Sequence, residues 1–308
     1  MAEHYLSGER VHQCWDNSLS PLLTIDPGDT VVLETRDASN GHLTPYSTLS
    51  DYQNRPTGKG HPLTGPIAIR GAEPGDTLVV EILELKHKGW GWTGFRPGFG
   101  LLADEFPESY FTIWRLERDM GSFRPDIRLP LAPFCGVMGV APHEPGTFPT
   151  IAPAAHGGNM DIRHLTQGST LFLPVFVPGA LFSVGDGHAA QGDGEVCGTG
   201  IEAPLVVTLR FHLRPQEHLP EPQFFTPTLL SPRAQAQGFY VTTGYHSDLM
   251  ECTRKAIRYM IEHLVRHHNL SREEAYILCS TAVDLKISEV VDAPHWIVSA
   301  YLPQSIFV

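Results

Sequence analysis

The stretch GDGHAAQGDGE, residues 185–195, gathers several potential metal ligands in one glycine-rich segment. Asp186 and His188 are two positions apart, as are Asp193 and Glu195, so in extended backbone each pair projects from one face. A mixed set of imidazole and carboxylate donors suits Zn²⁺ or another borderline divalent ion better than Mg²⁺. A surface turn with solvated carboxylates is the competing interpretation, because Asp-Gly sequences are common in turns.

A second polar segment, HGGNMD, spans residues 156–161 and again combines glycines with polar side chains. Asn159 and Asp161 are two positions apart, and His156 has the chemistry of a ligand, an oxyanion donor or a proton shuttle. His156 is equally compatible with capping a turn. Two such segments on either side of a predicted strand favour one shared site.

Two further segments contain residues suited to the rim of a pocket. In HPLTGP, residues 61–66, two prolines fix the backbone and place His61 or Thr64 at a rim, or simply form a rigid turn before a strand at 67–72. The segment GWGWTGFRPGFG supplies aromatic side chains that either line a substrate pocket or pack beneath a loop, namely Trp90, Trp92, Phe95 and Phe99.

The elements that must position these residues are mainly strands. Turns containing Pro or Gly are followed by runs rich in β-branched residues, which predicts strands at 29–36, 77–85, 171–177, 180–184 and 205–213. An apolar repeat of three and four residues predicts a helix over 248–268, and the capping box that begins at Ser271 predicts a second helix. A closing strand is predicted at 295–303.

This pattern predicts a mainly β fold with a jelly-roll-like or partly open barrel. We expect a β body at 1–213 that carries the site, a Pro-rich connection at 214–237, and a smaller α/β part at 238–308 packed on the body. The strand-and-turn spacing of about ten residues is shorter than a doubly wound α/β sheet requires.

Composition and charge exclude several classes of function. The 308 residues carry a formal net charge of −12 without a run of Lys or Arg, so nucleic acid and anionic membrane surfaces are not expected partners. No apolar segment is long enough to span a membrane. The five cysteines are dispersed and odd in number, which predicts no disulfide framework and a cytoplasmic location.

The quoted segments resemble the acetamidase/formamidase family. HPLTGPIAIRGAEPGD, PFCGVMGVAP, HGGNMD and GALFSVGDGHAAQGDGEV occur in that order, and AYILCSTAVDLKISEVVDAP is similar to the family's C-terminal region. The resemblance implies hydrolysis of a small aliphatic amide, formamide or acetamide, to the carboxylate and ammonia. It also implies a mainly β fold with a small α/β part, and a homo-oligomer of two or more subunits.

On this basis we expect metal-assisted hydrolysis. Asp161, Asp186 and His188 are the predicted ligands of a divalent ion, with Zn²⁺ favoured and Ca²⁺ as the alternative. The ion would polarise the amide carbonyl and activate a water, whose proton Glu195 would pass to the leaving nitrogen. Asp193 is the alternative base, and His156 is a possible fourth ligand or catalytic group.

The substrate contacts are predicted from the same segments. The backbone N–H groups of Gly157 and Gly158 are candidates for holding the oxyanion, and Asn159 and His61 are candidates for contacting the amide. Two rival functions stay open. One is an amidase that uses a cysteine nucleophile, Cys135 or Cys197; the other is a non-catalytic metal-binding β protein.

Overall fold

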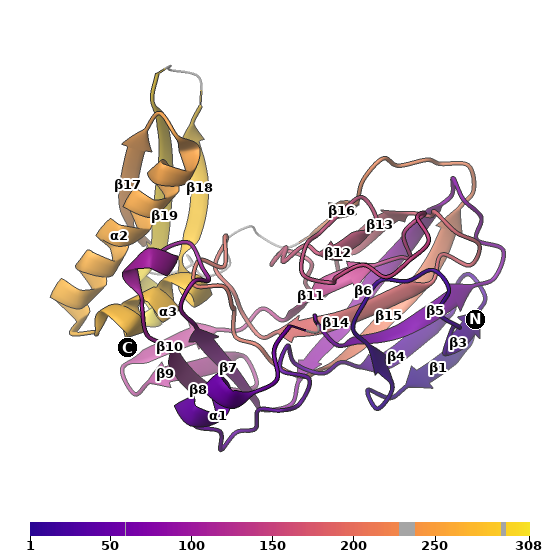
Figure 1. Cartoon of the computed structure of the whole chain (residues 1–308), viewed down its shortest axis with the longest axis horizontal. Helices are drawn as coiled ribbons and strands as arrows, with labels where there is room; N and C mark the ends of the chain where they lie inside the picture. The colour runs from indigo at the N-terminus through magenta and orange to yellow at the C-terminus, as the bar shows by residue number, and fades with distance from the viewer. Residues whose placement is uncertain (59, 228–237, 291–293) are drawn as a thin grey trace.

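The computed structural model describes residues 1–58, 60–227, 238–290 and 294–308. Its strands form four open sheets, two of which make up the larger, right-hand part of the molecule in Figure 1. The first of these two sheets has the order β1 (Glu3–Leu6), β4 (Thr30–Glu34), β15 (Leu205–Arg214), β6 (Thr77–His87), β13 (Thr170–Pro174) and β16 (Gln223–Phe225).

The second large sheet carries most of the polar segments identified above. Its order is β12 (Gly157–Asn159), β11 (Phe134–Gly139), β14 (Phe182–His188), β5 (Leu63–Ile69) and β2 (Val11–His12), with β3 (Leu23–Ile25) also paired to β5. The two sheets enclose one hydrophobic core, in which Phe182 of β14 meets Phe211 of β15 with ring centroids 5.1 Å apart. The alternating burial of β4 and β15 is that of strands covering a core on one face.

Two smaller units lie beside this sandwich in Figure 1. One is an antiparallel sheet in the order β10 (Ile127–Pro130), β9 (Met120–Arg124), β8 (Tyr110–Glu117) and β7 (Trp90–Phe95), with the short helix α1 (Leu49–Asn54) nearby. The other is the C-terminal unit, in which helices α2 (Leu249–His268) and α3 (Arg272–Ala282) accompany the sheet β17 (Phe239–His246), β19 (Trp296–Pro303) and β18 (Asp284–Glu289).

The fold confirms a mainly β protein with a smaller C-terminal α/β part. The predicted helix at 248–268 is α2, capped by Asp248, whose side chain accepts a hydrogen bond from the Glu251 N–H. The capping box at Ser271 and Glu274 begins α3. Within the predicted connection at 214–237, residues 223–225 form β16, and residues 228–237 lie outside the described residues.

Two local predictions were wrong, both in the sheet that carries the site. HPLTGP is not a turn, because β5 already begins at Leu63 and runs through the cis Gly65–Pro66 peptide. GDGHAAQGDGE is not wholly a loop either, because β14 continues to His188. In both cases glycine or proline was taken as a chain break, whereas here the glycines lie inside strands where neighbouring backbone comes close. A Cβ on Gly185 would stand 2.3 Å from the carbonyl oxygen of Pro62.

Among the described residues, no helix combines the length and the apolar character that crossing a membrane requires.

Candidate active site

Three neighbouring segments of the second sheet bring the predicted ligands together. Asp161 follows β12, and Asp186 lies in β14, with Gly136 of β11 between them. The backbone N–H groups of Met160 and Asp161 both donate to the Gly136 carbonyl oxygen, at 3.0 and 3.2 Å. Potential ligand atoms of Asp161, Asp186 and His188 all lie within 4.8 Å of one another. The sheet thus brings Asp161 close to Asp186 and His188, which follow it by 25 and 27 positions in the sequence.

Gly136 cannot carry a side chain, because side-chain atoms of the predicted ligands lie where its Cβ would be. A Cβ there would stand 2.4 Å from Asp161 Oδ1 and 2.5 Å from Asp186 Oδ2. Such distances are shorter than any real Cβ contact, so a side chain at this position would displace the carboxylates. The glycine therefore keeps open the space into which the two carboxylates point.

Three carboxylates of the site lie on backbone in the left-handed region. The φ angles are 48° at Asp161, 55° at Asp186 and 43° at Glu195. A residue with a side chain in this region costs roughly 1 kcal/mol or more, and such strain clusters at functional sites. Bends therefore occur at the acidic residues themselves as well as at neighbouring glycines such as Gly158 and Gly194, whose φ angles are 96° and 103°.

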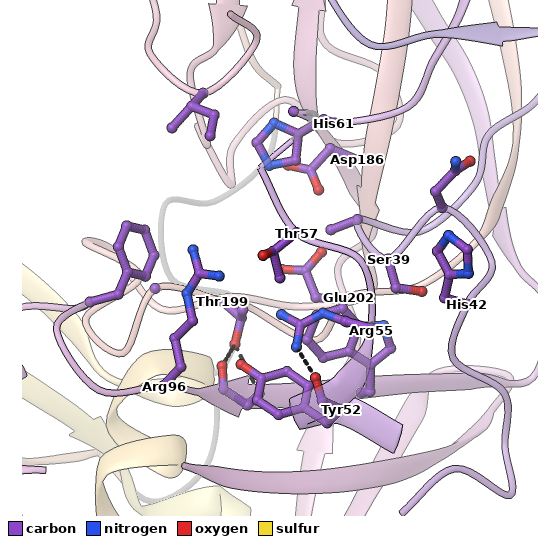
Figure 2. A pocket seen from close by; sticks show the side chains of 18 of the residues that line it. Ser39, His42, Tyr52, Arg55, Thr57, His61, Arg96, Asp186, Thr199 and Glu202 are labelled. Carbon is purple, nitrogen blue, oxygen red and sulfur yellow. Dashed lines mark hydrogen bonds between the residues drawn. The ribbon is translucent and has the colours of Figure 1, made fainter. Parts of the chain in front are cut away.

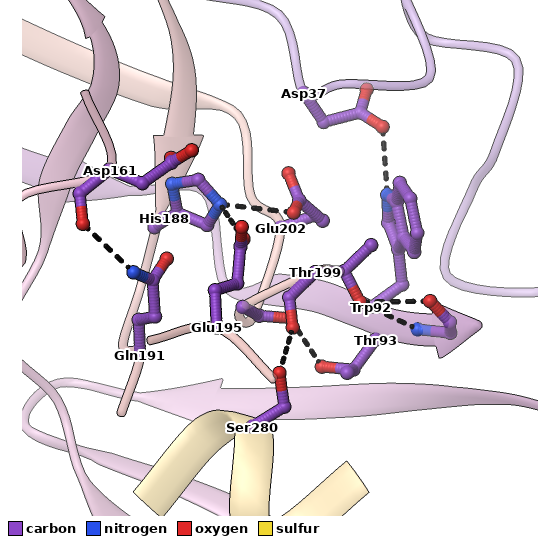
Figure 3. Close-up of polar contacts among 12 residues, drawn as sticks. Asp37, Trp92, Thr93, Asp161, His188, Gln191, Glu195, Thr199, Glu202 and Ser280 are labelled. Atoms are coloured by element: carbon purple, nitrogen blue, oxygen red, sulfur yellow. Dashed lines mark hydrogen bonds and ion pairs between the residues drawn. The ribbon is translucent and has the colours of Figure 1, made fainter. Parts of the chain in front are cut away.

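His188 connects these carboxylates to a second pair. Its Nε2 lies 3.0 Å from Glu202 Oε1 and 3.3 Å from Glu195 Oε1, as Figure 3 shows. The imidazole is fully buried and stacks on Phe134, with ring centroids 4.9 Å apart. Together Asp161, Asp186, His188, Glu195 and Glu202 form what we call the acidic cluster.

Glu202 was missed by the sequence reasoning. It lies in GTGIEAP, a segment without a ligand pattern, 14 positions beyond His188. Its backbone exchanges two hydrogen bonds with Trp92 of β7, at 2.8 and 2.9 Å, which places the side chain beside the imidazole. The only signal in the sequence was an acidic residue three positions before the apolar strand β15.

The cluster holds more negative charge than its surroundings neutralise. Burial, and then the charges of Glu195 and Asp186, raise the pKa of Asp161 well above its usual value. Burial and the charge of Asp186 raise the pKa of Glu202 to about 8, although His188 acts in the opposite direction. Burial by itself would lower the pKa of His188, but Glu202 and Asp186 raise it well above its usual value. One imidazole cannot balance four carboxylates in so closed a space.

The cluster also leaves polar atoms without partners. Among the described residues, Asp161 Oδ1, Asp186 Oδ1, His188 Nδ1 and Glu202 Oε2 are buried and accept or donate no hydrogen bond within the protein. Buried polar groups are almost always satisfied, so four such atoms in one place indicate a missing partner. A divalent cation would satisfy oxygen and nitrogen atoms alike and would reverse the charge imbalance.

The donor set fits a metal ion on one further criterion. Metal-binding histidines usually donate their second ring N–H to a carboxylate, which fixes the ring and its tautomer. In His188 the partner carboxylate is Glu202 at Nε2, while Nδ1 is the unpartnered nitrogen. Asp161, Asp186 and His188 Nδ1 would thus hold the ion, and Glu202 would orient the imidazole.

The four carboxylates of the acidic cluster line a pocket of about 390 Å³. Asp186 and Glu202 are seen in Figure 2, with His61 drawn beside Asp186. Asn159, His61 and the aromatic residues Trp92, Phe95 and Phe99 also line this pocket, whereas Trp90 lies outside it. The His61 N–H donates to Thr150 Oγ1 at 2.6 Å, which holds that histidine at the rim.

Other predicted residues lie away from the cluster. His156 packs against Trp15, with ring centroids 4.9 Å apart, and does not line the pocket. Asp193 turns toward Arg163 and His164, at 4.0 and 3.8 Å, although it is only two positions from Glu195. Positive φ angles at both Gly194 and Glu195 explain the difference, because they break the alternation of extended backbone.

The two glycines of HGGNMD are not arranged as an oxyanion hole. The Gly157 N–H donates to the Ala154 carbonyl oxygen at 3.0 Å, so this donor is already used. Gly158 stands opposite Met138 in the β11–β12 pair. Neither glycine lines the pocket.

The C-terminal unit holds the loop that follows His188. Ser280 of α3 accepts a hydrogen bond from the Cys197 N–H at 3.1 Å and donates one to the Thr199 carbonyl oxygen at 2.8 Å. The contact of Ser280 with the Thr199 segment is visible in Figure 3. The loop carrying Glu195 is therefore fixed between the β sandwich and α3.

Comparison with known proteins places this arrangement in a family. The family model described as "Acetamidase/Formamidase family" matches residues 3–147 and 145–308, which together span nearly the whole chain. The chain belongs to the acetamidase/formamidase family. The predicted family and the predicted enzyme class, a hydrolase acting on the carbon–nitrogen bond of amides, are thereby confirmed.

Individual relatives agree over almost their full length. A formamidase from Methylophilus methylotrophus is 26% identical, with 97% of this chain and 89% of the relative aligned. The structure of a gamma lactamase from Delftia acidovorans superimposes with a TM-score of 0.91 at 27% identity, covering 99% of this chain and 93% of that one. An acetamidase structure from Bacillus halodurans gives a TM-score of 0.68 at 32% identity, covering 97% and 96%.

Proposed function

We propose that the acidic cluster binds one divalent cation and that the chain uses it to hydrolyse the carbon–nitrogen bond of a small amide. The observation that carries this proposal is the set of buried, unpartnered ligand atoms on Asp161, Asp186 and His188 around the space that Gly136 leaves open. A bound ion of the Zn²⁺ type would polarise the amide carbonyl and make a water molecule more acidic. Family membership supplies the amide as the substrate class.

The residues of the chain have separate tasks in this scheme. Asp161, Asp186 and His188 Nδ1 hold the ion, and Glu202 keeps the imidazole in the tautomer with a free Nδ1. Glu195 is the base, because its side chain is 19% exposed and reaches the pocket, whereas that of Glu202 is only 3% exposed. Glu195 accepts a proton from the attacking water while the water oxygen bonds to the carbonyl carbon. It then delivers that proton to the nitrogen, which leaves as ammonia.

A cysteine nucleophile is disfavoured by the surroundings of both candidates. Burial raises the pKa of Cys135 to about 12 and that of Cys197 to about 11, so both thiols stay protonated at neutral pH. Cys135 precedes Gly136 in β11 and therefore points to the opposite face of the strand, into the hydrophobic core.

A second candidate substrate is a cyclic amide. The structure with the TM-score of 0.91 is called a gamma lactamase, and the pocket of about 390 Å³ is far larger than formamide. Opening a lactam breaks the same bond but leaves the amine on the product, so no ammonia is released. Aromatic side chains in the lining, Trp92 and Phe95 among them, are suited to the apolar face of a ring.

The decisive experiment measures amide hydrolysis and bound metal on the same protein. Formamide, acetamide, propionamide and urea would be assayed by ammonia release, and a γ-lactam by formation of the amino acid. We expect turnover that a chelator abolishes and one divalent ion restores, with no loss after treatment with a thiol reagent. Turnover that survives complete metal removal and disappears with the thiol reagent would contradict the proposal and favour the cysteine alternative.

A further inference from the structure

The pocket is lined by side chains of both charges. Asp161, Asp186, Glu195 and Glu202 are its acidic residues, and Arg55 and Arg96 are the lysine or arginine residues that line it among the described residues. Figure 2 shows both guanidinium groups among the lining side chains, with Arg55 beside Tyr52 and Arg96 on the left. Amides such as formamide and acetamide are neutral, so the proposed reaction by itself gives no reason for two cations there.

Neither arginine is used to balance a carboxylate. Most arginines that the structure describes lie within 4.0 Å of an acidic side chain, but no such ion pair is formed by Arg55 or Arg96 with any described residue. The charges that act most strongly on Glu202 come from within the cluster, from His188, Asp186 and Glu195. The two guanidinium groups are therefore available to a ligand.

Arg55 is also held in place. One of its nitrogens donates to the Tyr52 carbonyl oxygen, and its Cζ lies 3.8 Å from the centroid of the Tyr52 ring and 5.5 Å from that of Trp92. Stacking on aromatic rings orients the planar guanidinium and leaves its remaining N–H groups directed away from the rings. Arg96 lies 5.7 Å from the centroid of the Phe99 ring. Burial raises the pKa of the Tyr52 hydroxyl, and the charges of Arg55 and Arg96 both act to lower it.

The size of the pocket points the same way. A volume of about 390 Å³ lies in the range of roughly 300–1,000 Å³ that is usual for pockets that hold drug-sized ligands, whereas acetamide has only a handful of non-hydrogen atoms. A substrate with one end at the acidic cluster and the other at the arginines would fill this space. A planar carboxylate matches the guanidinium fork in a bidentate pair better than any neutral group does.

We propose that the preferred substrate is an amide that also carries a carboxylate group a few bonds from the scissile carbon, and that Arg55 and Arg96 bind this carboxylate. The inference rests on the proposed amide hydrolysis and adds the substrate class to it. Arg55 and Arg96 select the substrate in this account, while the acidic cluster carries out the reaction.

The test compares carboxylated amides with neutral amides of the same chain length. The metal-loaded protein would be assayed with succinamate, glutaramate and adipamate against butanamide, pentanamide and hexanamide. We expect kcat/KM to be at least about tenfold higher for one carboxylated amide than for its neutral counterpart, since a charged hydrogen-bonded pair contributes roughly 1.5–3 kcal/mol. Equal or faster turnover of every neutral counterpart would overturn the inference.

The variants Arg55→Gln and Arg96→Gln test the assignment of residues. Each should reduce the ratio of kcat/KM for the carboxylated amide to that for the neutral amide by about tenfold, mainly through KM. Arg118→Gln is the matched control, because the Arg118 side chain is 95% exposed and lies outside the pocket, so this variant should keep the wild-type ratio. Equal loss on both substrates would contradict the inference and assign the arginines to a general electrostatic role.

Binding distinguishes a failure of this inference from a failure of the proposed reaction. If no amide is turned over, the proposed reaction fails, and calorimetry with glutaramate still tests the arginines. Binding that weakens about tenfold in Arg96→Gln but not in Arg118→Gln would support the carboxylate site. Binding that is absent or unchanged in both variants would overturn it.

Discussion

Two regions of the molecule bury charged side chains, and they do so in opposite ways. The acidic cluster places four carboxylates around one imidazole and leaves ligand atoms without partners. Where strand β18 of the C-terminal unit begins, Asp284 forms a direct ion pair with Arg163, and the Arg163 and Asp284 side chains are only 4% and 1% exposed. Asp193 is close to the same arginine, and its N–H lies 3.4 Å from Asp284 Oδ1.

The difference separates a structural charge from a functional one. In the Arg163–Asp284 pair each charge has its partner inside the protein. The pair joins the segment that follows Asp161 to strand β18. In the acidic cluster the missing partner is positive and must come from outside. We therefore expect that removing a carboxylate charge destabilises the protein at the Arg163–Asp284 pair but not in the metal-free acidic cluster.

The largest effect is expected from closing the space between the carboxylates. Gly136→Ala adds a methyl group at 2.4–2.8 Å from Asp161, Asp186 and His188 without removing any ligand. Losing an ion that provides several kcal/mol of transition-state stabilisation should lower kcat/KM roughly a thousandfold. The measurement is steady-state hydrolysis with bound metal determined in parallel. Gly121→Ala is the control, because its new methyl group meets Leu116 and Leu131 at 3.2 Å and Trp114 at 3.4 Å, none of which belongs to the acidic cluster. Full activity in Gly136→Ala would show that no ion occupies this space.

Removing a charge should destabilise one region and not the other. Asp284→Ala leaves the buried Arg163 with only the more distant and half-buried Asp193, and we expect a loss of about 3–5 kcal/mol in the free energy of unfolding. In metal-free protein, Asp161→Asn removes one of several like charges and should leave the free energy of unfolding unchanged or higher. Denaturant titration of both variants and the wild type measures these values. A large destabilisation by Asp161→Asn would mean that the cluster is balanced without an ion.

A smaller effect is expected at the carboxylate that orients the imidazole. Glu202→Gln keeps the shape of the side chain but weakens its hold on His188 Nε2, and should lower metal affinity and activity by about 10–100-fold. Competition with a chromogenic chelator gives the affinity, and Glu195→Gln provides the contrast. That second variant should retain the ion while losing activity, because Glu195 is assigned to proton transfer. Equal metal loss in both variants would contradict this division.

The sequence allowed much of the site to be predicted because its ligands occur in short local patterns. Asp186 and His188 share one segment, and Asp161 closes HGGNMD, so glycine-rich polar stretches beside apolar strands identified them. Glu202, Arg55 and Arg96 could not be found in this way. Each is a single charged residue in an ordinary loop or strand end, and only the pairing of β7, β11 and β14 and the packing of α1 bring them to one pocket.

The errors arose where backbone conformation departs from the usual preference of the residue type. Glycines 185 and 187 were expected to bend, yet they lie in β14 and Asp186 adopts the left-handed conformation instead. Positive φ angles at Gly194 and Glu195 direct Asp193 to Arg163 and leave only Glu195 in the cluster. The overall β architecture was less sensitive, because it depends on many strands with alternating burial. The homo-oligomeric state and the cytoplasmic location stay predictions.

The central claim is that the acidic cluster of this protein holds a divalent cation, and the metal content of the purified active protein tests it most directly. We expect about one tightly bound divalent ion per chain, and almost none in Asp186→Asn prepared in the same way. Wild-type protein that hydrolyses amides at full rate with no divalent ion bound would contradict the claim.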